Sequence, residues 1–264
     1  MNATTAEATT PKLIIEGPKA TIRLNRPAKL NRIEPPDLTA LGEHLRTIES
    51  NDSLRVVVLT GTGRVFSAGY HLGDLDDRKS GQTTAPSDED SFETVANALE
   101  ACRLPTICAL NGSVYGGATD LALACDFRIG IDGTELVMPA GRLGVHYYRG
   151  GMERYVSRLG LNSAKKLFMT AQPMKSEEML RIGYLSESVP AEQHAERVAE
   201  LAEILANNAP LSVQNMKRAL NEIARNSLDT QAFEQGYKAC LASNDLAEGL
   251  SAWKDRRKPN FRGA

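Results

Sequence analysis

The chain has 264 residues, of which 42% are apolar and 24% are charged, as in an ordinary globular protein. Its net charge of −2 gives no reason to expect a nucleic-acid partner or a membrane surface. The four cysteines have neither metal-ligand spacing nor the pattern of a small secreted domain, so we expect buried, reduced thiols and a cytoplasmic protein. No apolar run approaches the length of a transmembrane helix.

Up to residue 190, strand patterns alternate with helix patterns, which is typical of an α/β fold. The continuous apolar run at 54–60 predicts a strand buried on both faces, and residues 65–72 predict a second strand that runs into a glycine turn. Further strands are predicted at 13–16, 20–24, 106–110 and 127–131, and helices at 37–50, 92–102, from 118, 152–159, 163–170 and 176–182.

The two ends of the chain differ from this alternating part. Residues 1–12 are rich in Thr and Ala and predict a disordered tail, so the core is expected at 13–190. Residues 191–264 predict a helical region whose apolar stripes must pack against the core or another subunit. Its helices are predicted at 195–207, 211–225, 229–242 and 246–253.

One long polar stretch interrupts the core. Residues 78–91 contain one Ala and one Pro and otherwise only polar residues or Gly, so they cannot bury a face. They predict a mobile loop. It is either a cover for a neighbouring site or an insertion without function, and the sequence leaves both open.

The stretch from Asn111 to Asp126 predicts a strand, a glycine turn and then a helix. Gly112, Gly116 and Gly117 permit backbone geometry that side chains would block. The first N–H groups of the helix have no partner inside it, so its start suits an anion that forms during a reaction. The alternative is structural: glycine pairs often serve close packing, and an acidic residue in a first turn often only complements the helix dipole.

Two glycine turns together resemble those of the crotonase superfamily, the enoyl-CoA hydratase/isomerase family. They are Phe66-Ser-Ala-Gly-Tyr-His-Leu72 and Gly112-Ser-Val-Tyr-Gly-Gly-Ala-Thr-Asp120, and the resemblance covers nearly the whole chain. It implies an acyl-CoA thioester substrate whose carbonyl oxygen accepts hydrogen bonds from the N–H groups of Tyr70 and Gly117. Two such preorganised donors stabilise a thioester enolate.

The resemblance also implies further features of fold and binding. The fold would be a crotonase-like spiral of strand–strand–helix turns with a C-terminal helical extension, assembled as a homotrimer or homohexamer. The Ala68 carbonyl would contact the adenine of coenzyme A, and Lys29 and Leu30 would line its channel. The basic tail around Arg257 would either reach a neighbouring subunit's coenzyme A or remain solvated. Coenzyme A is part of the substrate, and no metal or redox cofactor is implied.

The sequence departs from the hydratases of this family, which use two glutamates. The first of these positions is Asp120 and the second is Ala140, which cannot exchange a proton. The segments Leu143-Gly-Val-His-Tyr147 and Arg257-Lys-Pro-Asn-Phe261 resemble the methylmalonyl-CoA decarboxylase branch instead. That branch carries a histidine where this chain has Tyr70 and a glutamate where it has Asp120.

Three functions follow from this comparison. We favour decarboxylation or double-bond isomerisation, with Asp120 and Tyr147 as the groups that handle a proton or position a carboxylate and His146 as a further substrate contact. Hydration by an atypical acid/base set is the first alternative. A degenerate member that binds acyl-CoA without catalysis is the second.

Overall fold

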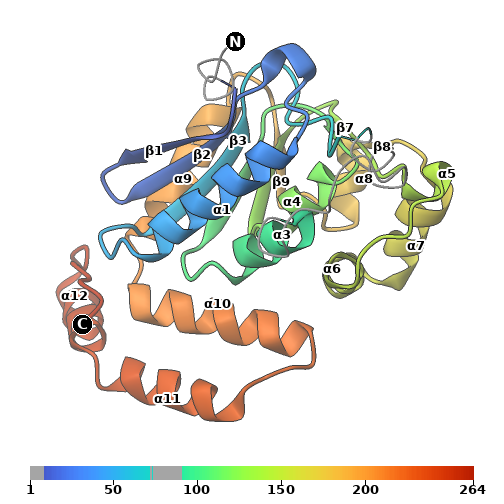
Figure 1. Cartoon of the computed structure of the whole chain (residues 1–264). Helices are drawn as coiled ribbons and strands as arrows, with labels where there is room; N and C mark the ends of the chain where they lie inside the picture. The colour runs from blue at the N-terminus through green and yellow to red at the C-terminus, as the bar shows by residue number, and fades with distance from the viewer. Residues whose placement is uncertain (1–8, 72, 74–90) are drawn as a thin grey trace.

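The computed structural model describes residues 9–71, 73 and 91–264, and its main element is a six-stranded sheet (Figure 1). The first two strands form the predicted hairpin and are antiparallel, whereas every later pair of neighbours is parallel. In sheet order the strands are β1 (Lys12–Glu16), β2 (Lys19–Leu24), β3 (Val56–Gly61), β4 (Thr106–Leu110), β6 (Phe127–Ile131) and β9 (Glu187–Val189). Apart from Ser91, the predicted loop 78–91 lies outside the described residues.

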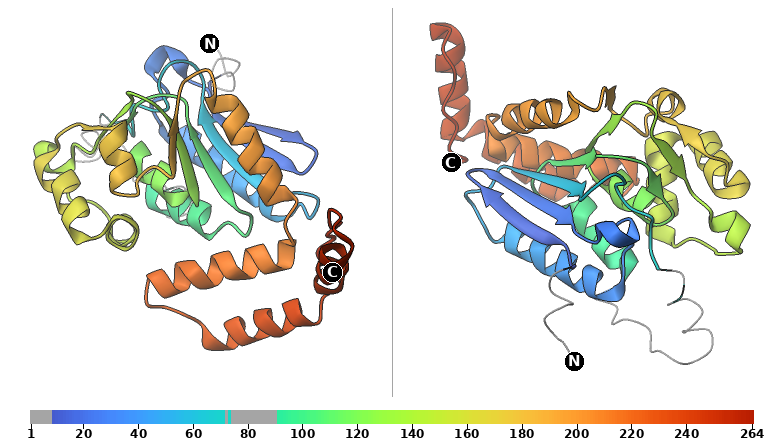
Figure 2. Two further views of the ribbon diagram at one scale, coloured as in Figure 1. Left: turned by 180° about the vertical axis from the view of Figure 1, so that it is seen from behind. Right: turned by 90° about the horizontal axis from the view of Figure 1, so that it is seen from above.

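Both faces of the large sheet are covered, as the apolar run of β3 predicts. Val56 and Val58 pack with Val198 of α9 (His194–Ala206), whereas Val57 and Leu59 belong to the larger core on the other face. That core also contains buried residues of α1 (Pro35–Glu49), α3 (Phe92–Ala101) and α4 (Ala118–Ala124), and Figures 1 and 2 show these helices on the side opposite α9. The alternating side chains of one strand therefore connect two layers of helices.

A second, smaller sheet was not predicted. It consists of β5 (Val114–Tyr115), β7 (Glu135–Val137) and β8 (Met174–Lys175), strands too short to show a period-two pattern.

The predicted strand at 65–72 is wrong in the part that the structure describes, because Ser67 and Tyr70 form only isolated bridges there. The glycine turn predicted at the end of this segment is present, because Gly69 has a φ of +90°.

The remaining helices surround the smaller sheet and extend beyond it. Near the smaller sheet lie α5 (Ala140–Leu143), α6 (Arg149–Leu159), α7 (Leu161–Thr170) and α8 (Ser176–Arg181), and a short 3-10 turn, η2 (Pro27–Lys29), precedes α1. At the C-terminal end, α10 (Pro210–Ala224), α11 (Thr230–Leu241) and α12 (Asn244–Asp255) follow α9 and lie beyond the sheet (Figure 2). In the part of the chain described, no helix is both long and apolar enough to cross a membrane.

The ends of the predicted helices lie within a few residues of those in the structure. The division of the chain at residue 190 into a core and a C-terminal helical region stays a prediction. Lys12 already belongs to β1, so the predicted tail is at least one residue too long. Three of the cysteines are buried free thiols, as predicted, but Cys240 is only half-buried because α11 lies at the surface.

A single buried asparagine joins the segment after β2 to the turn after β3. Asn31 is 2% exposed, and its amide nitrogen donates to the carbonyls of Thr62 and Val65, each at 2.9 Å. Its amide oxygen accepts from the Arg26 N–H at 3.0 Å. A side chain that saturates so many buried backbone groups fixes the distance between the two segments.

We predict that Asn31→Ala lowers the free energy of unfolding by about 2–4 kcal/mol, because it leaves buried carbonyls without donors. Urea denaturation measures the change. Asn226→Ala is the matched control, since Asn226 has the same φ of +52° but is exposed. Equal losses in the two variants would show that backbone strain, rather than the buried hydrogen bonds, causes the effect.

Candidate active site

The two glycine turns meet at one cavity of about 530 Å³. Its wall is mainly apolar and aromatic, with backbone from both turns. The lining residues are Ala68, Tyr70, Ser91, Phe92, Tyr115, Gly116, Gly117, Met138, Pro139, Ala140, Leu143, Val145, His146, Tyr147 and Tyr148. A concave apolar pocket with a few polar groups is the form that small-molecule sites usually take.

The turns are joined to each other by backbone hydrogen bonds. Ser67 and Val114 form a parallel bridge, the Tyr115 N–H donates to the Ser67 carbonyl at 3.0 Å, and the Phe66 N–H donates to the Ser113 carbonyl at 3.1 Å. The sequence predicts the two turns separately. The structure brings them together at the end of the central strands.

Glycine is required where the turns touch. A Cβ atom on Gly69 would lie 2.6 Å from the Tyr115 carbonyl oxygen and 3.2 Å from the Gly116 Cα. Both glycines have positive φ, +90° and +54°, which other residues adopt only with strain. Tyr70 and Gly117, the predicted hydrogen-bond donors, each follow one of these glycines, and both line the cavity.

The predicted coenzyme A contacts lie beside the first turn. The Ala68 N–H donates to the Leu30 carbonyl at 2.8 Å, and Ala68 also lines the cavity. Lys29 is exposed, with its ammonium 3.5 Å from a carboxylate oxygen of Glu34. Of the three, Lys29 and Leu30 are not part of the cavity wall, and the coenzyme A role of all of them stays a prediction.

One wall of the cavity is a row of aromatic rings. Tyr147 and Tyr148 are stacked with their centroids 4.5 Å apart and their planes at 26°. Phe92 contacts Tyr148 at 6.2 Å and Tyr70 at 6.0 Å, and Phe168 packs behind Tyr147 at 5.2 Å. These spacings are typical of attractive aromatic contacts, so the wall is rigid and apolar.

Asp120 is not part of the cavity wall. It is completely buried in the first turn of α4, and its Oδ2 atom accepts a hydrogen bond from the Tyr148 hydroxyl. The same oxygen lies 2.7 Å from Nη1 of Arg154, which is also completely buried. The predicted proton-handling carboxylate is therefore committed to an ion pair behind the tyrosines.

Tyr147 offers a different kind of polar group. Its hydroxyl is buried and makes no hydrogen bond of ordinary geometry within the described part of the chain. Burial raises its pKa well above the usual value, and the negative charge of Asp120 and the nearby Tyr148 hydroxyl add to the rise. The Tyr147 hydroxyl therefore stays protonated at physiological pH and is a hydrogen-bond donor rather than a base.

The other two predicted positions are also in the wall. Ala140 lines the cavity with 6% of its surface exposed, so the second glutamate position faces the cavity without a carboxylate. His146 is exposed, and its Nδ1 lies 2.8 Å from the Tyr147 carbonyl oxygen. Among the described lining residues there is no carboxylate and no ammonium or guanidinium group.

Arg154 was missed by the sequence analysis. It lies on the buried face of α6 together with Gly150, Gly151 and Tyr155, so an arginine at an apolar position of the helical period was the available signal. Phe92 was also missed, since a single aromatic residue at a helix start resembles any core residue.

The described fold and site define a class of protein: an α/β spiral that presents two backbone turns to an apolar cavity. Comparison with known proteins agrees. The family model "Enoyl-CoA hydratase/isomerase" matches residues 16–264, and this chain belongs to that family of acyl-CoA enzymes. The predicted crotonase-like fold is thereby confirmed.

Several relatives are similar over nearly their whole length. A short-chain-enoyl-CoA hydratase of Clostridium acetobutylicum is 31% identical over 92% of this chain and 94% of its own. A carnitinyl-CoA dehydratase of Salmonella arizonae is 33% identical over 96% of this chain and 98% of its own. The solved structure of an enoyl-CoA hydratase from Bacillus anthracis has a TM-score of 0.84 and 29% identity, with 97% of this chain and 100% of that chain covered.

We predict that Gly69→Ala lowers kcat by about 100-fold or more on any thioester that the wild type converts, because the new methyl group separates the two turns. Steady-state kinetics measure the loss. Gly17→Ala is the matched control: Gly17 has a φ of +57°, and a Cβ atom there meets nothing within 4 Å. A Gly69→Ala enzyme with wild-type kcat would contradict the assignment of the turns to catalysis.

Proposed function

We propose that this enzyme decarboxylates a malonyl-type CoA thioester through an enolate intermediate. The observation that carries the proposal is the absence of a carboxylate from the described cavity wall, with Ala140 at one expected position and Asp120 paired to Arg154 at the other. Loss of carbon dioxide from such a thioester needs no general base.

The chemistry matches the groups that are present. The bond between the α-carbon and the carboxylate carbon breaks, carbon dioxide leaves, and the bonding electrons form the enolate. Its oxygen would be held by the N–H groups of Tyr70 and Gly117, and a solvent proton then adds to the α-carbon. An apolar aromatic wall favours this step, because the charge leaves a carboxylate that is poorly solvated there and reaches an oxygen with fixed donors.

The Tyr147 hydroxyl supports the same proposal. It is a buried donor without an ordinary hydrogen bond in the described structure, and the side chain that carries it lines the cavity. A substrate carboxylate that accepts its hydrogen bond would be oriented for cleavage, since the direction of the breaking bond decides whether its electrons can enter the enolate.

Isomerisation of a double bond is the second candidate, and His146 favours it. An isomerase must remove a proton and return it, and His146 is the lining residue in the described part that carries an imidazole, a group able to accept and donate a proton. Hydration, the activity in the names of several relatives, requires two groups that exchange protons with water, and the described wall lacks the usual pair.

Mass spectrometry of the protein incubated separately with methylmalonyl-CoA, crotonyl-CoA and a 3-enoyl-CoA tests the proposal. We expect loss of carbon dioxide from methylmalonyl-CoA and no conversion of crotonyl-CoA. Gain of water on crotonyl-CoA would contradict it in favour of a hydratase, and migration of the double bond alone would favour the isomerase. Recovery of bound but unchanged thioesters in every tube would indicate a binding protein.

Ala140→Glu and Ala140→Gln provide the matched control for this experiment. Both add the same volume at one lining position, but only glutamate adds a negative charge beside the substrate carboxylate. Decarboxylation should fall further in the glutamate variant than in the glutamine variant. Equal losses would show that charge in the wall does not matter for the reaction.

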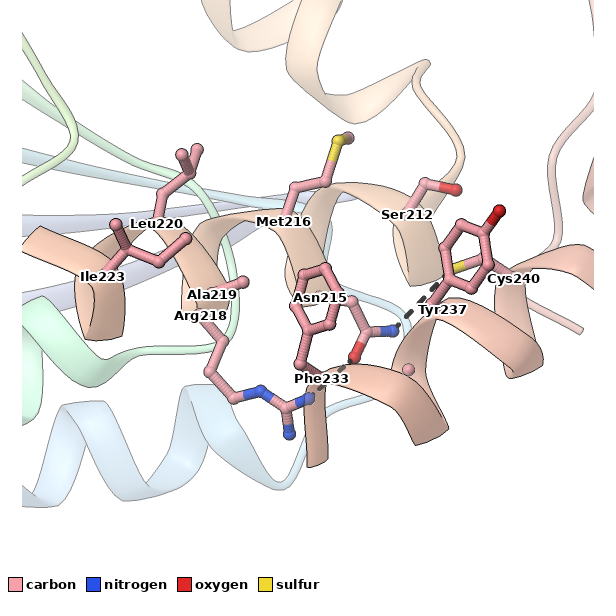
Figure 3. A pocket seen from close by; sticks show the side chains of 11 residues that line it. Ser212, Asn215, Met216, Arg218, Ala219, Leu220, Ile223, Phe233, Tyr237 and Cys240 are labelled. Carbon is pink, nitrogen blue, oxygen red and sulfur yellow. Dashed lines mark hydrogen bonds between the residues drawn. The ribbon is translucent and has the colours of Figure 1, made fainter. Parts of the chain in front are cut away.

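We also propose that copies of this chain cover the apolar surface of α10–α12, as the predicted trimer or hexamer requires. Figure 3 shows a groove between α10 and α11, of about 360 Å³, lined by Met216, Leu220, Ile223, Phe233 and other residues. Leu220 is 64% exposed, and Trp253 on α12 is 86% exposed. Apolar side chains of this size in a row usually mark an interface.

Size-exclusion chromatography with light scattering tests this assembly. We expect a trimer or hexamer for the wild type and a smaller species for Leu220→Asp, because a buried carboxylate without a partner opposes association. Ile15→Lys is the control, since Ile15 is an exposed apolar residue that belongs to β1 and not to α10–α12. A wild-type monomer at assay concentration would contradict the proposal.

A further inference from the structure

The largest completely buried side chain in the described structure is that of Arg154, directly behind the cavity wall. Besides its contact with Asp120, its Nη2 donates to the Asn97 side-chain oxygen at 2.8 Å, and its Nε lies 3.1 Å from Glu100 Oε1. The fully charged guanidinium thus contacts two acidic side chains and an amide inside the core. Such a group is costly to bury unless its partners are all held in place.

Two further arginines contact Glu100, one of the partners of Arg154. Glu100 also contacts the guanidinium groups of Arg158 and Arg225, the latter from α10. Arg225 also contacts Glu153, which pairs with Arg149. Three carboxylates and four guanidinium groups therefore form one connected cluster, which extends from the outer helix α10 to the first turn of α4, where Arg154 holds the Asp120 carboxylate.

The Asp120 carboxylate makes one described hydrogen bond with a residue of the cavity wall, which it accepts from the Tyr148 hydroxyl. Tyr148 donates that hydrogen bond away from the cavity, and its ring is stacked on Tyr147. Gly151 makes the arrangement possible: a Cβ atom there would lie 2.4 Å from Tyr147 Cε1 and 2.9 Å from Asp120 Oδ2. Tyr147 and the carboxylate are thus packed against the same point of α6.

We infer that Arg154 and Asp120 are positioning residues that set the orientation of Tyr148 and, through the ring stack, of the Tyr147 hydroxyl. This inference deepens the proposed function and rests on it for the role of Tyr147 toward a substrate carboxylate. It replaces the predicted proton-handling role of Asp120 with a role that acts through another side chain. In this role the Asp120 carboxylate accepts the hydrogen bond from the Tyr148 hydroxyl and does not contact the substrate.

A double-mutant cycle of Asp120→Asn and Tyr148→Phe tests the inference. Asparagine still accepts the Tyr148 hydrogen bond, so kcat/KM for the converted thioester should fall less than about 10-fold, and the double variant should be no worse than the poorer single variant. A group that transfers the proton itself contributes roughly 100-fold to 10,000-fold. A loss of that size in kcat with unchanged KM, additive with Tyr148→Phe, would overturn the inference.

Variants of Arg154 provide the second part of the test. Arg154→Lys keeps the charge and should retain most activity, whereas Arg154→Met leaves Asp120 unpaired and should weaken both folding and turnover. Adding Asp120→Asn to Arg154→Met should restore folding, because no buried charge is then left alone at Asp120. Tyr155→Phe is the matched control: it removes a buried α6 hydroxyl that bonds to Thr119 rather than to Asp120, and it should not change kcat/KM.

The same variants separate failure of this inference from failure of the proposed function. Calorimetric affinity for carboxymethyl-CoA, a thioether that carries a carboxylate but cannot decarboxylate, is measured for each of them, and this readout does not need turnover. If the wild type decarboxylates nothing, the proposed function fails. The cycle is then judged on affinity. Non-additive effects of Asp120→Asn and Tyr148→Phe on the affinity support the ring-positioning role, and additive effects overturn it.

Discussion

The contact between the backbones of the two glycine turns is the constraint on which the rest of the site depends. Gly69 lies against the Tyr115 carbonyl and the Gly116 Cα, with no room for a side chain on the first of these glycines. The turns can approach because β3 and β4 are adjacent and parallel, so that the segments after them leave the same edge of the sheet. Tyr70 and Gly117, the predicted donors from distant parts of the sequence, thereby reach one cavity, and the sheet sets their separation. Neither turn alone defines a place for an oxyanion.

A second constraint is electrostatic and lies behind the aromatic wall. The charges of Arg154, Asp120 and Glu100 cannot be solvated in the core, so each must be satisfied by another. That requirement makes the back of the cavity rigid. It also keeps the Asp120 carboxylate out of the cavity wall, because this carboxylate is already paired with the Arg154 guanidinium group. The two tyrosines of the wall carry hydroxyl groups whose pKa values are raised by burial, so both hydroxyls stay neutral.

Local sequence patterns predict most of the fold because they reflect local physics. The apolar run of β3 and the helical stripe of α9 are visible in the sequence, and both lie where their patterns indicate. The strands β5, β7 and β8 have two or three residues each, too few for a periodicity, and only their pairing in space defines them. The motifs also predict which positions face the cavity, including Ala140 and Tyr147. They cannot predict that Asp120 points to Arg154, because this pairing depends on the packing of α4 against α6.

The pairing of Asp120 with Arg154 changes how the missing glutamate at Ala140 is understood. Taken alone, Ala140 describes a hydratase site that has lost one of its two acid/base groups. With Asp120 withdrawn into an ion pair, neither position provides a carboxylate to the cavity, and the part of the lining that the structure describes carries none at all. A neutral wall suits a substrate that brings its own negative charge, since a wall carboxylate would repel it. The same arginine that removes Asp120 from the cavity also holds the tyrosine hydroxyls in order, so one buried interaction accounts for both the withdrawal of this carboxylate and the ordered aromatic wall.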